Sequence, residues 1–156
     1  MHQVDQLDSR LLHLLAAEPR ISVLEISRRL AVARGTVQAR LDKLSARGVI
    51  SSFAPSLDPE ALGFGVTAFA TLEIKQGRGD AVLAHLDRVP EVLEVHKITG
   101  PGDLLCRIVA HDNGDLQRVI DEVVRDHDIE RTSTVISLAA PIRYRVLPLV
   151  TAAADA

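Results

Sequence analysis

Two strand–helix–strand patterns follow each other in the second half of the chain, and this repetition restricts the fold more than any other feature. The predicted order is strand, helix, strand, strand, helix, strand over residues 66–74, 81–89, 92–99, 104–110, 115–125 and 129–138. Two such units in series are typical of a ferredoxin-like α+β sandwich, in which both helices cover one face of the sheet. An apolar face left open would favour pairing with a second copy, sheet against sheet.

The segment over 21–50 predicts two short helices that meet at a tight corner. Ser22 and Glu25 form an S-x-x-E pattern, which marks the start of the first of these helices. The apolar periodicity breaks at 31–33 and resumes in a second helix with one buried face: Val37, Leu41 and Leu44. The outward face of that helix carries small, amide and cationic side chains, which a DNA major groove can accept. With a leucine-rich helix predicted over 5–17, this region is expected to be a three-helix DNA-binding unit.

The second helix, with its flanking arginines, and the end of the first helix supply the candidate DNA contacts. The candidates for base contacts are Arg34, Thr36 and Gln38, because arginine pairs with guanine, glutamine with adenine, and threonine contacts the thymine methyl group. The candidates for phosphate contacts are Arg28, Arg29, Lys43 and Arg47. Arg40 lies near the buried stripe, so it is either a DNA contact or the partner of an acid such as Asp8 or Asp42. For the whole set, the alternative is a solvated cationic helix face.

Charge is distributed unevenly along the chain. Residues 1–50 hold eight Lys/Arg and five Asp/Glu, a net of +3, whereas the remaining residues hold 10 and 16, a net of −6. This asymmetry favours a DNA-facing part joined to a part with a different role, with ordinary surface scatter as the alternative.

Motifs for catalysis and for metal or nucleotide binding are missing from the sequence. The six histidines show no HExxH or paired spacing, and there is no P-loop, G-x-S-x-G or G-x-G-x-x-G pattern. We therefore expect no enzyme activity, no metal and no cofactor.

The single cysteine, Cys106, rules out an intrachain disulfide, and its apolar surroundings in the sequence predict a buried thiol. No apolar run reaches membrane-spanning length and the first ten residues are polar, so we expect a soluble cytoplasmic protein without a membrane partner.

The order and spacing of these parts resemble the Lrp/AsnC (feast–famine) family of transcriptional regulators. The matching residues are Leu7-Asp8, Leu14-Leu15, Arg20, the run Thr36–Leu41, Leu44, Gly48–Ile50, Leu62-Gly63, the turn Thr99–Asp103 and Arg131–Thr134. The resemblance implies an α+β chain with a winged-type helix-turn-helix domain over 1–50, a linker over 51–65 and a ferredoxin-like βαββαβ (RAM) domain over 66–156. Three positions depart from the family pattern: Ala31 replaces a turn glycine, Ala33 a capping serine and Ser45 an acidic residue. These departures leave the DNA sequence preference open.

The resemblance also implies a function. It implies a regulator that binds double-stranded promoter DNA as homodimers, which assemble into a larger oligomer, an octamer, and respond to an amino acid bound at dimer–dimer contacts. The implied effector residues are Thr99, Gly100, Gly102, Asp103 and Leu104, with Thr132 and Thr134 as candidate hydroxyl partners. Glycines let backbone amides approach a carboxylate, and an aspartate can accept an ammonium group. The alternative is a plain β-turn with Pro101 and Gly102 at its centre.

Two other functions fit the same architecture. The first is a tetrapyrrole (siroheme-type) decarboxylase, for which the nearby candidate residues are His96, Lys97 and Arg107. The second is a nucleoid-type DNA binder without an effector. In the tail, Tyr144 and Leu149 are expected to pack on a neighbouring subunit or to lie in a short edge strand.

Overall fold

A computed structural model describes residues 4–155 of the chain. The structure divides into two compact units, of which the first runs to Ser56 and resumes at Ile142, and the second spans Leu57–Pro141. The chain therefore passes between the units twice. Among the described residues, no helix is long and apolar enough to cross a membrane.

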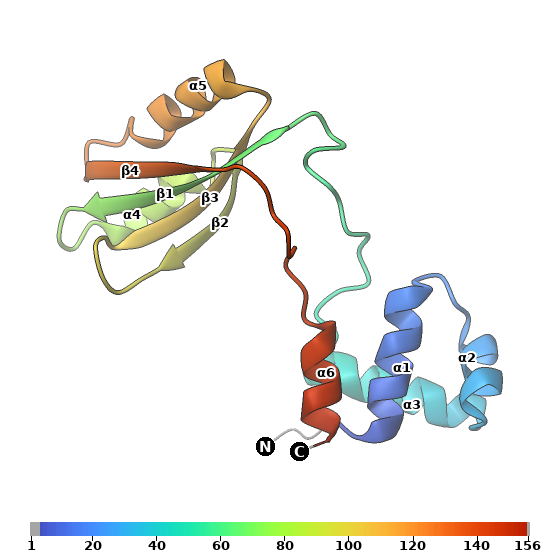
Figure 1. Cartoon of the computed structure of the whole chain (residues 1–156). Coiled ribbons are helices and arrows are strands. Elements are labelled where there is room, and N and C mark those ends of the chain that lie inside the picture. The colour runs from blue at the N-terminus through green and yellow to red at the C-terminus, as the bar shows by residue number, and fades with distance from the viewer. Residues whose placement is uncertain (1–3, 156) are drawn as a thin grey trace. The chain divides into compact units, whose positions relative to one another are not determined.

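The first unit is built from helices (Figure 1). They are α1 (Gln6–Ala17), α2 (Val23–Leu30), α3 (Arg34–Ala46) and α6 (Leu147–Ala154). The predicted start of α2 is confirmed, because the Ser22 hydroxyl accepts a hydrogen bond from the Glu25 amide at 3.1 Å. Helix α1 begins with a reciprocal capping box between Asp5 and Asp8. Leucine, isoleucine and valine from the first three helices form the core: Leu11, Ile26, Leu30, Val37 and Leu44.

The corner between α2 and α3 shows what two departures from the family pattern do to the backbone. Ala31 adopts the left-handed conformation, with φ 55° and ψ 43°, and is the one non-glycine residue with positive φ in the described chain. A Cβ atom makes this conformation unfavourable by about 1–2 kcal/mol. Ala33 occupies the N-cap of α3 and provides no side-chain hydrogen bond. Both features lower the stability of the corner.

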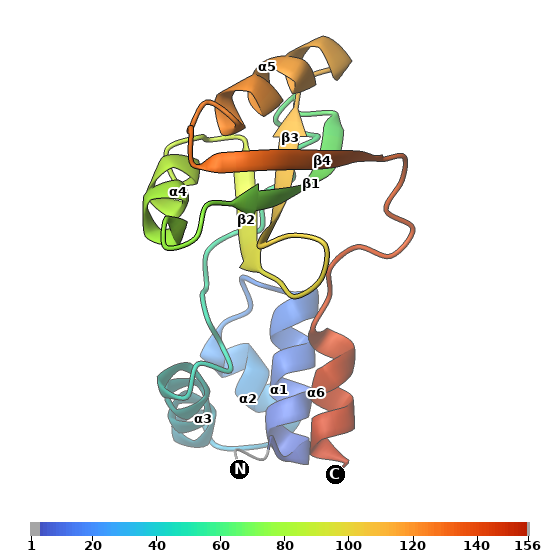
Figure 2. The ribbon, with the colours of Figure 1, turned by 90° about the vertical axis from the view of Figure 1, so that its left-hand side faces the viewer.

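The tail forms a helix where an edge strand was one of two predicted outcomes. Figure 2 shows α6 beside α1, and the two helices are joined by a 2.8 Å hydrogen bond from Gln6 Nε2 to Asp155 Oδ1. A proline in the first turn of α6 and the three alanines that follow favour helix. Tyr144 stays outside this contact and is 89% exposed.

The second unit has the predicted ferredoxin-like arrangement. Its elements are β1 (Val66–Ile74), α4 (Gly79–Leu86), β2 (Val92–Lys97), β3 (Leu104–Ala110), α5 (Asn113–Val123) and β4 (Ile129–Ser137). The strands form one sheet in the order β2-β3-β1-β4, and every pair of neighbours is antiparallel. Both helices lie on one side of it (Figure 1).

The two sheet faces differ in composition. The face beneath the helices holds the core, including Ala70, Leu72 and Cys106; burial raises the pKa of this thiol to about 11. The pairing register places Phe69, Arg107 and Val135 together on the other face. That face was expected to be apolar, but it is mixed, with several charged side chains: Glu73, Glu94, Arg107 and Arg131.

The linker ends in a turn that is fixed to the second unit. Residues 59–63 form turns, with the Glu60 amide donating to Asp58 Oδ1 at 3.0 Å. The ring of His111 stacks on Phe64 at 4.3 Å between centroids, and its Nδ1 lies 2.8 Å from the Gly63 carbonyl oxygen. These contacts position the residues that lead into β1.

Candidate DNA interface and effector site

Helix α3 turns the predicted contact side chains outward. Val37 and Leu44 are buried in the core, which fixes the rotation of the helix. The outward row is exposed throughout: Arg34, Gly35, Thr36, Gln38, Ala39, Asp42 and Lys43. All three candidates for base contacts are therefore accessible, with Arg34 and Gln38 one turn apart and Thr36 on the other flank of the outward row.

Four of the predicted cations are available to an external partner. Arg34, Lys43 and Arg47 are exposed, and none of them makes an ion pair within residues 4–155. The Arg28 side chain is 69% exposed, and its Nη1 lies 3.9 Å from a Glu25 oxygen, a surface contact of little energetic weight.

Two other predicted cations are held by carboxylates of their own unit. Arg29 donates to Glu25 at 2.9 Å and to Glu18, and the hydrogen bond to Glu18 is the main reason why the pKa of Arg29 is raised. Arg40 contacts Asp5 and lies 3.1 Å from Asp8 Oδ1. The Asp8 side chain is only 4% exposed. Of the two roles left open for Arg40, the geometry favours the ion pair with Asp8.

Asp42, the other acid considered for Arg40, binds a different residue. Gln38 Nε2 donates to Asp42 Oδ1 at 2.8 Å, a pairing typical of residues four apart on a helix. The amide that is predicted to pair with adenine is therefore engaged within α3.

The turn between β2 and β3 is fastened to β1 through its backbone. The Asp103 amide donates to the Leu72 carbonyl oxygen at 2.9 Å, and Asp103 Oδ2 accepts from the Ile74 amide at 2.8 Å. A Cβ on Gly102 would lie 2.4 Å from Thr71 Cγ2 and 3.2 Å from the Leu72 oxygen, so this position has no room for a side chain. The carboxylate predicted to accept a ligand ammonium group thus already holds the end of β1.

The turn itself is not the predicted β-turn centred on Pro101 and Gly102. The positive φ, 114°, belongs to Gly100. The Gly102 amide donates to the Gly100 carbonyl oxygen at 2.9 Å, which closes a three-residue turn around Pro101.

The predicted effector residues fall into two groups. Thr99, Gly100 and Asp103 are exposed at the turn, with Gly102 half-buried beside them. Leu104, Thr132 and Thr134 lie instead on the helix-covered face, where Leu104 and Thr132 are the two neighbours of Leu72 in the sheet. Thr132 Oγ1 is buried and has no hydrogen-bond partner within the described chain.

Sequence reasoning missed the second role of Asp5. This residue caps α1 and also contacts Arg40. The D-x-x-D spacing of Asp5 and Asp8 ahead of a leucine-rich helix is the signal that could have identified the cap.

Comparison with known proteins identifies the family. A model of the Lrp/AsnC ligand binding domain matches residues 67–147, and a winged helix-turn-helix DNA-binding model matches residues 4–51. The chain belongs to the Lrp/AsnC family of transcriptional regulators.

It is 30% identical over 146 residues to the HTH-type transcriptional regulator FL11 of Pyrococcus horikoshii, covering 94% of this chain and 97% of that relative. The structure of Escherichia coli AsnC is similar with a TM-score of 0.86 and 26% identity, covering 94% of this chain and all of that one. A Neisseria meningitidis transcriptional regulator solved in complex with L-Met has a TM-score of 0.80 and 25% identity, covering 89% and 92% of the two chains.

Family membership decides between a regulator and an enzyme. The relatives of this Lrp/AsnC protein are transcriptional regulators, so the decarboxylase alternative is wrong. The geometry agrees, because the candidate residues for that chemistry are dispersed. His96 and Arg107 lie on the open sheet face within 4.0 Å of Glu94, whereas Lys97 belongs to the opposite face.

Proposed function

We propose that this Lrp/AsnC regulator recognises promoter DNA through the outward face of α3. In this proposal Arg34, Thr36 and Gln38 contact base edges, and three flanking cations contact phosphates: Arg28, Lys43 and Arg47. The observation behind it is that α3, anchored by buried Val37 and Leu44, exposes all of these groups except Arg28, which is exposed on α2. Arg29 and Arg40 then support the fold of the unit rather than the DNA contact.

Gly35 supports a close approach of DNA to the first turn of α3. Glycine within a helix costs about 0.5–1 kcal/mol relative to alanine. A Cβ at Gly35 would meet nothing within 4 Å, and φ at this position is not positive, so neither packing nor backbone conformation requires the glycine. We expect Gly35→Ala to stabilise the protein and to weaken DNA binding.

The second proposed input is an amino acid at the turn over 99–104. The Neisseria meningitidis relative was solved with L-Met, and in this chain Thr99 and Gly100 are exposed beside a turn fixed to β1. Because Asp103 already holds the Ile74 amide, we expect backbone groups of the turn to contribute most of the ligand contacts.

We further propose that the protein acts in the cytoplasm as homodimers that assemble into an octamer. Phe69 and Val135 on the open sheet face, with charged residues around them, suit a sheet-to-sheet contact between two copies. A dimer would place two α3 helices in successive major grooves about 34–36 Å apart, so a pseudo-palindromic site is expected. Sedimentation analysis tests the assembly directly.

Binding to the promoter region of its own gene tests the DNA proposal. Gln38→Ala should weaken specific sites and leave nonspecific DNA unaffected, whereas Lys43→Gln should weaken all sequences and reduce the salt slope by about one. A purified protein that shows no salt-sensitive binding to this DNA would refute the proposal. Weak dependence on sequence, together with no response to any amino acid, would favour the nucleoid-type alternative.

A thermal-shift screen against the amino acids tests the effector proposal separately. A ligand that binds the folded state should raise the melting temperature with concentration. Thr99→Val removes an exposed hydroxyl group beside the turn, so it should reduce the ligand-induced shift in melting temperature. Because the side chain is exposed, we expect the variant to remain folded. If no amino acid shifts the wild-type protein, the effector proposal fails while the DNA proposal stands.

A further inference from the structure

A hollow of the second unit lies between α4 and the turn that joins α5 to β4. It has a volume of about 490 Å³. One wall is formed by α4 and the residues at its two ends, with Ala81 and His85 on the helix, Arg78 at its N-cap and Arg88 just beyond its C-cap. The small alanine leaves room where the neighbouring cations would otherwise meet.

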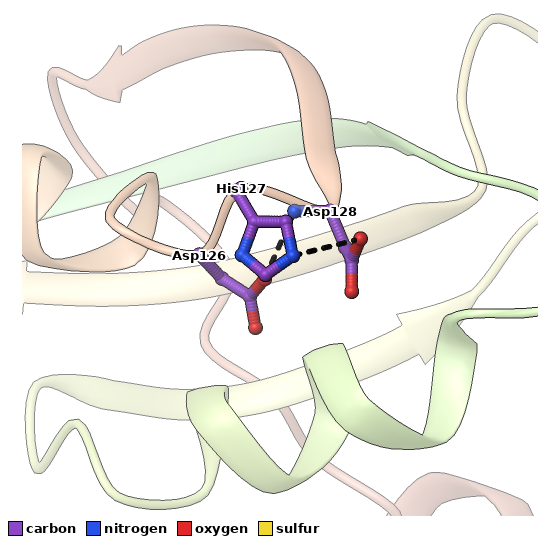
Figure 3. A group of neighbouring side chains, drawn as sticks. All are labelled: Asp126, His127 and Asp128. Atoms are coloured by element: carbon purple, nitrogen blue, oxygen red, sulfur yellow. Dashed lines mark hydrogen bonds and ion pairs between the residues drawn. The ribbon is translucent and has the colours of Figure 1, made fainter.

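The opposite wall is the turn over 125–128, which Figure 3 shows facing α4. The two walls are tied together at both ends. Arg78 Nε donates to Asp128 Oδ2 at 2.7 Å, and His85 Nε2 lies 2.9 Å from the Glu122 carbonyl oxygen. The hollow is therefore preorganised by contacts that a ligand need not break.

Asp126, His127 and Asp128 cluster on this turn, but they do not make a cation site. Their ligand atoms lie within 4.8 Å of one another. Asp128 is however already neutralised by Arg78 at 2.7 Å and by Lys75 at 3.7 Å, and Asp126 Oδ1 accepts the Asp128 amide at 2.9 Å. The hydrogen bond from Arg78 holds the pKa of Asp128 below its usual range. Positive charge from the protein occupies the place a metal would take.

The remaining donors around the hollow are cationic. Residues 57–141 hold eight Lys/Arg and fifteen Asp/Glu, a net of −7, yet three of those eight cations line this hollow: Arg78, Arg88 and Arg125. Arg88 makes no ion pair within the described residues. Arg125, just beyond the end of α5, is 71% exposed and pairs with Glu122 of that helix, a surface contact that an incoming anion can replace at little cost.

We infer that this hollow binds a small dianion, either a dicarboxylate or a phosphate monoester. The guanidinium group presents paired N–H donors that match carboxylate and phosphate oxygens. Arg88 and Arg125 bind the anion from the two walls, the terminal nitrogens of Arg78 add a third donor, and the small side chain of Ala81 leaves room between them. The site gives the regulator a second small-molecule input that does not involve the turn over 99–104.

Isothermal titration of the full-length protein at constant ionic strength tests this inference. The probes are inorganic phosphate, succinate and, as the neutral diamide of succinate, succinamide. Saturable binding of phosphate, of succinate or of both is expected, and the pattern distinguishes a phosphate ligand from a dicarboxylate. Arg88→Gln and Arg125→Gln should each weaken it about tenfold or more, because each removes charge-assisted hydrogen bonds.

The control is Arg10→Gln, which removes the same charge from an exposed position in the other unit and should leave affinity unchanged. Circular dichroism verifies that each variant is folded, and Thr99→Val should bind the anion as the wild type does. The inference is overturned if neither anion binds saturably, if succinamide binds as tightly as succinate, or if both hollow variants bind as the control does.

Discussion

Replacing Arg40 separates the role of α3 in the fold from its role in DNA binding. Arg40 lies 3.1 Å from Asp8, whose side chain is 4% exposed, and it also contacts Asp5, which is about half exposed. Arg40→Gln removes the guanidinium group and leaves the Asp8 carboxylate buried without its cation. The variant should therefore be less stable without losing a DNA contact.

The expected loss of stability in Arg40→Gln depends on how exposed the Arg40–Asp8 ion pair is. Removing one partner of a fully buried ion pair costs about 3–5 kcal/mol, whereas an exposed pair contributes about 1 kcal/mol or less. Arg40 is 29% exposed, so water partly solvates the carboxylate that is left behind. We expect the first unit to lose about 2 kcal/mol. Adding Asp8→Asn should recover part of this loss, because the buried charge is then absent.

Urea unfolding followed by circular dichroism measures the loss, and hydrogen exchange at the amides of α1 and α3 localises it. The matched control is Arg34→Gln on the same helix, which is exposed and unpaired within the described chain, and which should change stability by less than about 0.5 kcal/mol. In promoter binding we expect the opposite ranking, with the larger effect at Arg34 and the smaller one at Arg40. Arg34→Gln should weaken binding, while Arg40→Gln, assayed where it is folded, should keep the salt slope of the wild type. A stable Arg40→Gln protein with a reduced salt slope would refute the structural role.

Three further predictions concern local features. Ala31→Gly should raise the free energy of unfolding by about 1 kcal/mol in urea titrations, since glycine adopts the left-handed conformation without the Cβ penalty; an unchanged midpoint would contradict it. Arg78 lowers the pKa of Asp128, so its contribution is present above the ordinary carboxyl pKa of about 4 and is lost as pH falls through the lowered value. Arg78→Gln should therefore destabilise the protein at about pH 7 by an amount that shrinks below about pH 4, and a difference independent of pH would count against this. Because burial raises the pKa of Cys106 to about 11, a thiol reagent at about pH 8 should label the unfolded chain and spare the native one, as mass spectrometry would show.

The regular elements of the second unit could be predicted almost completely from local pattern. Strands β1 and β3 have the predicted bounds, because an apolar run bounded by turn residues identifies a buried strand without reference to the rest of the chain. The turn over 99–104 could not be predicted in this way. Its two glycines serve different needs, a positive φ at Gly100 and a close approach to Thr71 at Gly102, and the second depends on a strand about thirty residues earlier.

Helix α6 escaped prediction for a related reason. The tail has no amphipathic pattern strong enough to show which surface it covers, and no α6 residue is buried. Its position is set by polar contacts with residues near the other end of the chain, such as Gln6. Sequence position alone gives no indication of a contact across nearly the whole length of the protein.

Net charge predicted the role of the first unit correctly, but it could not show which of its cations are free to contact DNA. The excess of +3 over residues 1–50 indicated a DNA-binding role that the family confirms. Every acid of that region is engaged inside the unit: Asp5 and Asp8 by Arg40, Glu18 and Glu25 by Arg29, and Asp42 by Gln38. Four of these five carboxylates are thus gathered around two arginines that a composition count cannot distinguish from the rest. Because four of the five carboxylates lie at Arg29 and Arg40, the field at the outward face of α3 is set by cations without strong partners, chiefly Arg34, Lys43 and Arg47. These ion pairs are defined only by the tertiary structure. They determine which of the eight cations of residues 1–50 remain available to contact DNA.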